Sequence, residues 1–146
     1  MAAPFIFIGT YTLKEDKLED FTRYCQEFCE YIQANEPRLL YFGFCIDEDG
    51  TEVSVVQVHP DADSMAFHMQ LIAEHMEQVF DFLDTTKSVQ IYGAPSAALV
   101  EQIKQFSEPG VPVIVKPEVV GFNRFGNGDE PRAVSDRTHA LKGGRS

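Results

Sequence analysis

Apolar and polar residues follow one another in an order that predicts strand, helix, strand and strand over the first half of the chain. Residues 5–13 open with four apolar residues in succession, which is typical of a strand covered on both faces. After Asp16, a candidate cap, apolar residues recur at three- and four-residue spacing and predict a helix. Glu36-Pro37 ends this helix, because the residue before a proline avoids the helical conformation. Residues 39–46 and 52–59 then form a predicted hairpin, whose turn contains Asp and Gly.

A second helix and a fourth strand complete the pattern up to Gly93. Pro60 breaks the third strand, and Asp61 or Asp63 can cap the helix that follows. Its inner stripe is predicted to run from Met65 to Phe80 and includes two histidines, His68 and His75. Residues 87–92 form the predicted fourth strand.

The sequence after Gly93 predicts an extension and then a tail. A short helix is expected over residues 97–106, and residues 111–115 and 119–120 have the character of edge strands, where proline is tolerated. The stretch 123–146 is rich in Gly, Arg and Asp, which predicts a mobile tail. We therefore divide the chain into a domain over 1–93, an extension over 94–122 and a tail over 123–146.

The order strand, helix, strand, strand, helix, strand predicts an α+β protein of the ferredoxin-like βαββαβ type with an antiparallel sheet. In the strand 39–46, alternate residues place apolar side chains on both faces. Helices cover one face, so the second apolar face needs a partner. A second copy of the same sheet is the economical partner, and we expect a homodimer.

Composition narrows the possible partners. The net charge is −11, and the part before Gly121 carries −13, so a nucleic-acid or anionic-membrane partner is not expected. No apolar run approaches the ~20 residues of a membrane span, and the N-terminus lacks the features of a signal peptide. The three cysteines, Cys25, Cys29 and Cys45, are an odd number and are expected to be reduced in a cytoplasmic protein. The 12 Phe and 5 Tyr suit either an aromatic core or a pocket lined by rings.

His68 and His75 are the candidate catalytic residues. Seven residues of helix separate them by roughly 10 Å along one face, so they are not expected to hold one metal ion together. Both can instead point into one elongated pocket, where a neutral imidazole accepts a proton from an acidic phenol or enol. The alternative is that each is a packed residue of the core or the dimer interface. No metal or cofactor is expected.

Several other side chains are candidates for binding a substrate. Tyr11, Tyr41 and Tyr92 offer hydroxyl donors to a ligand carbonyl, although each can equally pack its ring and bond locally. His59 ends a predicted strand and is either a pocket residue or an exposed strand end. Met65, with its flexible thioether, and Ile72 on the same helix stripe suit a pocket for a flat hydrophobic ligand.

The chain resembles the antibiotic-biosynthesis-monooxygenase group of dimeric α+β barrels. The resemblance covers residues 5–92 and rests on the order of elements and on short segments. These segments are Glu36-Pro37-Arg38-Leu39-Leu40-Tyr41, Val55-Val56-Gln57-Val58-His59, Ser64-Met65-Ala66-Phe67-His68 and Glu74-His75. It implies that two sheets pair across a dimer axis, and that each subunit keeps a pocket between its sheet and helices.

The resemblance also implies a reaction type. Several members of the group oxidise aromatic polyketides with molecular oxygen and without metal or flavin, and another branch degrades haem with a histidine late in the second helix. This chain has His59 where many members carry Trp, and Thr10 where the haem-degrading branch carries Asn. A cofactor-independent monooxygenase acting on a hydrophobic small molecule is therefore the leading hypothesis. A non-catalytic ligand-binding or stress-response dimer is the alternative, and a haem-binding protein comes third.

Overall fold

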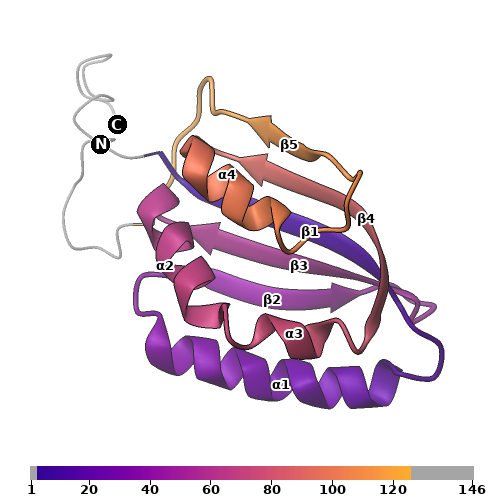
Figure 1. The fold of residues 1–146 in the computed structure, drawn as a ribbon. Helices are drawn as coiled ribbons and strands as arrows, with labels where there is room; N and C mark the ends of the chain where they lie inside the picture. The colour runs from indigo at the N-terminus through magenta and orange to yellow at the C-terminus, as the bar shows by residue number, and fades with distance from the viewer. Residues whose placement is uncertain (1–2, 126–146) are drawn as a thin grey trace, which may run out of the picture.

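The computed structural model describes residues 3–125, apart from the side chains of Met76 and Glu77. A sheet forms one layer and helices form a second layer against one of its faces (Figure 1). The strands are β1 (Phe5–Leu13), β2 (Tyr41–Ile46), β3 (Glu52–His59), β4 (Leu83–Tyr92) and β5 (Val113–Lys116). The helices are α1 (Leu18–Asn35), α2 (Ala62–Ile72), α3 (Met76–Val79) and α4 (Ala97–Lys104).

The strand order in the sheet is β2-β3-β1-β4-β5. The pairs β2–β3, β3–β1 and β1–β4 are antiparallel, and this confirms the predicted ferredoxin-like arrangement. β5 joins β4 in parallel, so the complete sheet is mixed where an antiparallel one was predicted. A parallel neighbour requires a crossover connection, and α4 supplies it between β4 and β5.

The core lies between the sheet and the helices. Phe5 and Phe7 of β1 are buried there with Val89 and Ile91 of β4, while α2 contributes its Met65 side and α4 contributes Leu99 and Ile103. The extension after Gly93 is therefore part of the same core. It is also tied to β4 by two hydrogen bonds between Thr86 and Glu108, at 2.9 and 3.3 Å.

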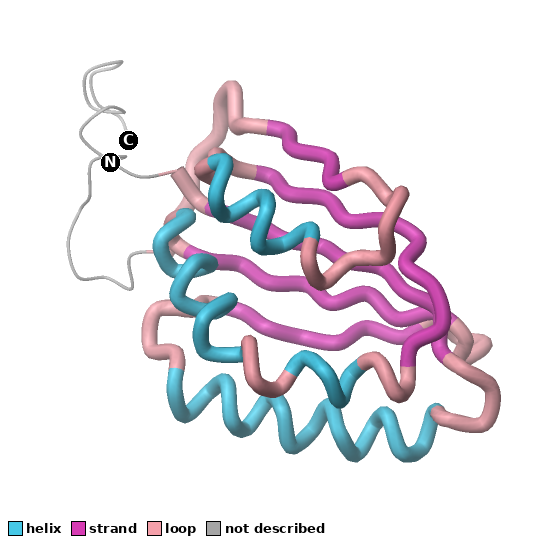
Figure 2. The backbone as a smooth tube through the Cα atoms, viewed as in Figure 1, coloured by secondary structure: helices cyan, strands magenta, loops and turns pink. Residues whose placement is uncertain are grey.

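The other face of the sheet has no described helix over it, as the tube drawing shows (Figure 2). Its centre is apolar, because Ile6 pairs with Val58 and Ile8 pairs with Val56 in the β1–β3 register. These four side chains are only partly exposed, whereas Tyr41 at the β2 edge is 49% exposed. We call this surface the open face.

The second predicted helix is divided in the structure. α2 ends at Ile72, the chain turns through residues 73–75, and the short α3 begins at Met76. The backbone N–H of His75 bonds to the carbonyl of Ile72 at 2.8 Å, a three-residue spacing that is tighter than that of an α-helix. The prediction of one stripe from Met65 to Phe80 was wrong, and neither Gly nor Pro in the sequence marks the break.

Other boundaries differ in smaller ways. Asp61 caps α2 by accepting from the backbone N–H of Ser64, whereas Asp16 does not cap α1 and instead takes a positive φ of 61°. β4 begins at Leu83, four residues earlier than predicted. The predicted strand at 119–120 is absent, because β5 ends at Lys116 and Pro117 cannot donate to a ladder.

The tail prediction for residues 123–146 falls almost wholly outside the described residues.

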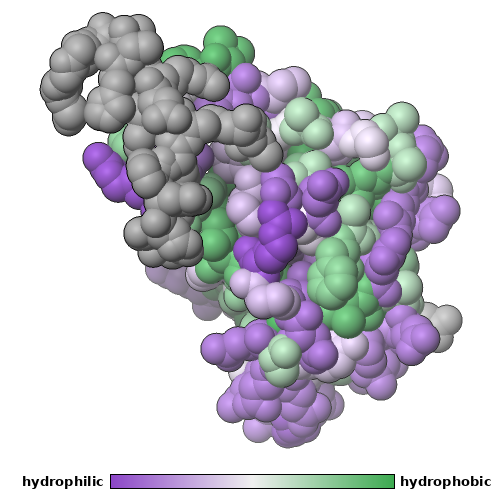
Figure 3. Space-filling model, turned by 90° about the vertical axis from the view of Figure 1, so that its left-hand side faces the viewer, coloured by the Kyte–Doolittle hydropathy of each residue, from purple (hydrophilic) through white to green (hydrophobic). Residues whose placement is uncertain are grey.

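Figure 3 views the molecule from the left-hand side of Figure 1 and shows hydrophobic and hydrophilic residues interspersed over the described part of this face. Among the described residues, none of the helices has the length and apolar character needed to cross a membrane.

Candidate functional site

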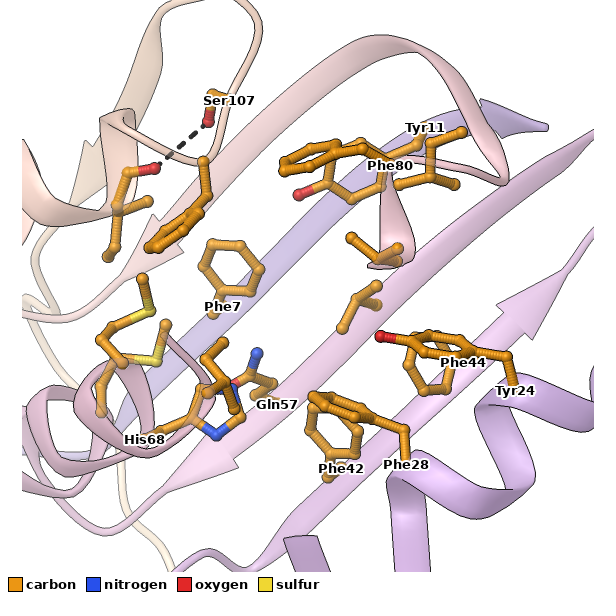
Figure 4. A pocket seen from close by; sticks show the side chains of 18 residues that line it. Phe7, Tyr11, Tyr24, Phe28, Phe42, Phe44, Gln57, His68, Phe80 and Ser107 are labelled. Atoms are coloured by element: carbon orange, nitrogen blue, oxygen red, sulfur yellow. Dashed lines mark hydrogen bonds between the residues drawn. The ribbon is translucent and has the colours of Figure 1, made fainter. Parts of the chain in front are cut away.

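A cavity lined largely by aromatic rings lies between the sheet and the helices (Figure 4). Its volume is about 70 Å³. Phe7 and Tyr11 of β1, Phe42 and Phe44 of β2, and Tyr24 and Phe28 of α1 form much of its wall. At one end α4 and the following turn supply Ile103, Phe106 and Ser107. The predicted pocket between sheet and helices is therefore present, and the extension helps to close it.

His68 brings a titratable group to this cavity. It projects from α2, is almost completely buried, and its Nδ1 lies 2.5 Å from Oε2 of Glu36. A carboxylate at that distance accepts the Nδ1 proton, so in the neutral ring Nε2 is the basic nitrogen. No hydrogen bond joins Nε2 to a described residue. His68 therefore carries a proton acceptor at the cavity wall, held in orientation by a buried carboxylate.

Sequence reasoning missed the part that Glu36 takes in this pair. Glu36 directly follows α1, where its backbone N–H bonds to the carbonyl of Ile32, and it continues the buried positions Phe21, Cys25 and Ile32 of the helix. An acidic residue at a position where the helical spacing predicts an apolar one was the available signal. Its second oxygen, Oε1, is buried without a hydrogen-bond partner among the described residues.

A second buried histidine, His59, lies next to the first, with ring centres 5.9 Å apart. Its Nδ1 is 2.7 Å from the hydroxyl oxygen of Ser64, and its Nε2 is 2.9 Å from Oε1 of Gln57. Burial, and to a smaller extent the neighbouring His68, lowers the pKa of His59 to about 3. His59 is therefore neutral near pH 7 and does not serve as a base.

Two tyrosines, Tyr11 and Tyr24, also line the cavity and bring hydroxyl groups to it. Burial raises the pKa of Tyr11 to about 12, and burial together with nearby Cys25 raises the pKa of Tyr24 to about 12. Both phenols therefore remain protonated donors at neutral pH. The ring of Tyr11 folds over Gly9, since a Cβ at that position would lie 2.5 Å from the Tyr11 hydroxyl oxygen.

The structure brings some of the predicted residues together and separates others. His68, Tyr11, Met65 and Ile72 line the cavity. His75 does not, because the turn after α2 places its ring against Tyr31 of α1, with centres 4.6 Å apart.

The remaining predicted pocket residues lie elsewhere. Tyr41 and Tyr92 are on the open face, because Tyr41 pairs with Val58 and Tyr92 pairs with Ile6 in the sheet register. His59 is fully buried behind the cavity wall and is hydrogen-bonded to the lining residue Gln57. Gln57 was not among the predicted site residues, although the period-two alternation of β3 places it on the covered face.

The cysteines do not add a reactive site to the cavity. Cys25, Cys29 and Cys45 are all free thiols, and burial followed by the nearby Cys29 raises the pKa of Cys25 to about 12. Within the described part of the chain, no three His, Cys, Asp or Glu side chains gather closely enough to hold a metal ion.

Comparison with known proteins shows which fold this is. No family profile and no curated protein sequence matches the chain. Among solved structures, MupZ from Pseudomonas fluorescens matches with a TM-score of 0.64 and 23% identity, over 85% of this chain and 91% of that one. A proposed antibiotic biosynthesis monooxygenase from Nitrosomonas europaea matches with a TM-score of 0.53 and 19% identity, over 64% and 92%. One from Bacteroides thetaiotaomicron gives 0.52 and 15%, over 58% and 84%.

The chain thus has the fold of the antibiotic biosynthesis monooxygenases. The two proposed monooxygenases match over 58% and 64% of this chain. Residues 1–93 make up about the larger of these two shares. The match to MupZ covers about 124 residues, so it reaches beyond residues 1–93.

Proposed function

We propose that this protein is a cofactor-independent monooxygenase that binds a hydrophobic, aromatic small molecule in its ring-lined cavity. The observation that carries the proposal is the buried Glu36–His68 pair, whose imidazole lines the cavity. The shared fold supports a pocket at this place between sheet and helices, and the residues of this chain supply the chemistry.

His68 is the proposed general base. Its Nε2 takes a proton from an acidic C–H or O–H of the bound ligand, and the Nδ1–H bond to Glu36 holds the ring in place. The imidazolium that forms is stabilised by the adjacent carboxylate, in surroundings where water does not screen the attraction. Tyr11 and Tyr24 are proposed donors to the oxyanion that develops on the ligand.

The oxidation then proceeds between the ligand anion and molecular oxygen. The electron-rich anion transfers one electron to oxygen, and the resulting radical and superoxide combine into a peroxide that takes back the proton from His68. Loss of water converts the original CH₂ group and O₂ into a carbonyl group and H₂O. The ligand supplies all the electrons, and one oxygen atom is retained in the product.

Turnover by variants at His68 tests the proposal. Oxygen uptake is measured over a panel of hydroxynaphthalenes and hydroxyacetophenones, with mass spectrometry of products formed under ¹⁸O₂. His68→Gln is expected to lower kcat by about 10²–10⁴-fold, the usual contribution of a general base. His75→Gln, outside the cavity, is the matched control and should retain turnover. Ligand binding without oxygen uptake by the wild-type protein would contradict the monooxygenase and favour a binding protein of the same fold.

We further propose that the protein is a homodimer joined through the open face. The paired apolar residues at the centre of that face support this arrangement, because the helices of the described residues 3–125 cover the opposite side. The free cysteines fit the reducing cytoplasm, which is the proposed location.

A further inference from the structure

The hydrogen-bond chain Ser64–His59–Gln57 links the start of α2 to the cavity wall. Ser64 and His59 are both buried, and Gln57 is 4% exposed. The amide of Gln57 is a lining group of the cavity, and its nitrogen points into the space in front of Phe7 (Figure 4). Of the three hydrogen-bonded residues, Gln57 is therefore the one whose amide can touch a ligand, while Ser64 and His59 act through it.

Counting hydrogens along this chain fixes the direction of each bond. The Oε1 atom of Gln57 has only lone pairs, so Nε2 of His59 must carry the hydrogen that joins them. A neutral imidazole carries one hydrogen, and His59 is neutral because its pKa is about 3. Nδ1 is therefore an acceptor, and the hydroxyl of Ser64 donates to it. The amide –NH₂ of Gln57 is left to face the cavity with two donor hydrogens.

We propose that the Ser64–His59–Gln57 chain fixes the cavity wall beside His68 as a hydrogen-bond donor, so that the ligand is an aromatic ketone or enol with an acceptor oxygen there. This inference rests on the proposed function and names its substrate class. When His68 takes a proton from the carbon next to the carbonyl group of a ketone, or from the hydroxyl of an enol, negative charge develops on the oxygen that faces Gln57. The Gln57 –NH₂ is aimed to stabilise that charge.

The Ser64–His59–Gln57 hydrogen bonds also predict how the preference for a ligand with an acceptor oxygen can be lost. If Ser64 lacks its hydroxyl, nothing donates to Nδ1, and His59 can move its hydrogen from Nε2 to Nδ1. Gln57 then turns its amide around, donates to Nε2, and presents Oε1 to the cavity. An acceptor would face the ligand carbonyl, so a change outside the cavity wall would reverse the polarity of the wall.

A pair of probes of nearly equal shape tests this inference. Acetophenone and ethylbenzene share a ring and a two-carbon side chain and differ by one carbonyl oxygen. We expect wild-type protein to bind acetophenone about tenfold more tightly in calorimetry, the value of one good hydrogen bond. The infrared carbonyl stretch of bound acetophenone should move to lower frequency, a change that general stabilisation of the fold would not produce.

Three variants complete the test. Gln57→Leu should bind both probes equally and abolish the infrared shift, while its affinity for ethylbenzene is retained. Ser64→Ala should reduce the tenfold preference to about twofold or less; its helix cap is preserved, because Asp61 accepts from the backbone N–H of residue 64. Thr22→Ala removes an exposed hydroxyl of α1 and should change nothing.

The outcomes separate this inference from the proposed function. Equal binding of the two probes by wild-type protein would overturn the inference and leave the ligand cavity standing. Full preference in a folded Ser64→Ala variant would overturn the role of the chain. Binding of neither probe would count against the proposed function and, with it, against the inference.

Discussion

The covered and open faces of the sheet are built from the same strands and differ in what their side chains do. On the covered face, β3 presents Gln57 and His59, and these polar groups are buried and hydrogen-bonded. On the open face, the same strand presents Val56 and Val58 in the middle of an apolar surface. One strand therefore separates a face with chemically defined polar groups from a face suited to association.

The difference shows where reactivity can be built in a small domain. A buried polar group costs free energy unless it is bonded, so each polar side chain on the covered face needs a partner, and the partners fix its orientation and protonation. The open face carries hydroxyls such as Thr10 and Ser54, which bond to each other at 2.8 Å. Its histidine-free, apolar centre has no comparable acid or base among the described residues.

Adjacent residues of β1 test how differently the faces are packed. Phe5 is completely buried on the covered face, whereas Ile6 is partly exposed on the open face. Phe5→Ala should lower the free energy of unfolding by about 3–5 kcal/mol, because it leaves a cavity in the core. Ile6→Ala should cost less than about 1.5 kcal/mol in the monomer. Urea unfolding of both variants at low protein concentration gives the comparison, and equal costs would refute it.

A charge in the centre of the open face tests whether that face joins two copies. Val56 lies between Ile8 and Gly43, so Val56→Asp would bury an unpaired carboxylate in the proposed interface. We expect the dimer dissociation constant to rise at least about a hundredfold, or about 2.7 kcal/mol, in sedimentation equilibrium. The circular dichroism spectrum should be unchanged, and Thr22→Asp on exposed α1 serves as the control. A wild-type protein that sediments as a monomer would contradict the proposed interface, and so would an unchanged dissociation constant in Val56→Asp.

Acid should destabilise the covered face through His59. The pKa of His59 is about 3 in the folded protein and near 6.5 in the unfolded chain. Below pH 6.5 the unfolded chain therefore binds a proton at His59 that the folded chain does not bind until the pH approaches 3. The His59 contribution is fully present above pH 6.5 and is lost as the pH falls towards 3. Between pH 6.5 and 5 the expected loss is about 2 kcal/mol. Urea unfolding across pH measures it, and His59→Gln should remove this part of the slope.

The smallest expected change in stability concerns a contact that occurs on both faces, in which a tyrosine ring lies over a glycine. Tyr11 lies over Gly9 on the covered face, and Tyr41 lies over Gly43 on the open face. Gly9→Ala forces the buried Tyr11 hydroxyl away and should cost about 1 kcal/mol, with weaker binding of acetophenone. Gly43→Ala should change stability by less than about 0.5 kcal/mol, because the exposed Tyr41 can swing into solvent. Thermal melts of the two variants show whether the costs differ as expected.

Much of the fold could be predicted because it depends on local patterns. The alternation and the apolar opening of β1 gave its bounds, and the order of elements predicted the four antiparallel strands. The break between α2 and α3 could not be predicted, since residues 73–75 contain no helix breaker and the apolar spacing continues through them. Tertiary packing decides such a break, and a single-sequence pattern does not record it.

The site was predictable only in part, for a related reason. His68 could be placed on the inner face of its helix from spacing alone. Its partner Glu36 lies 32 residues earlier, and only the tertiary fold brings the two together. The chain of Ser64, His59 and Gln57 spans a short stretch, but its bonds need the turn between β3 and α2 to be known.

The extension after Gly93 supplies a part of the cavity wall that is distinct in sequence from the acid–base pair. The acid–base pair Glu36–His68 is built wholly within residues 1–93, whereas Ile103, Phe106 and Ser107 complete the cavity wall from outside those residues. Exchange of this segment between relatives could lengthen or shorten the chamber without altering the proton acceptor. Ligand size and reaction chemistry could therefore evolve independently in this protein, each under the control of a different part of the chain.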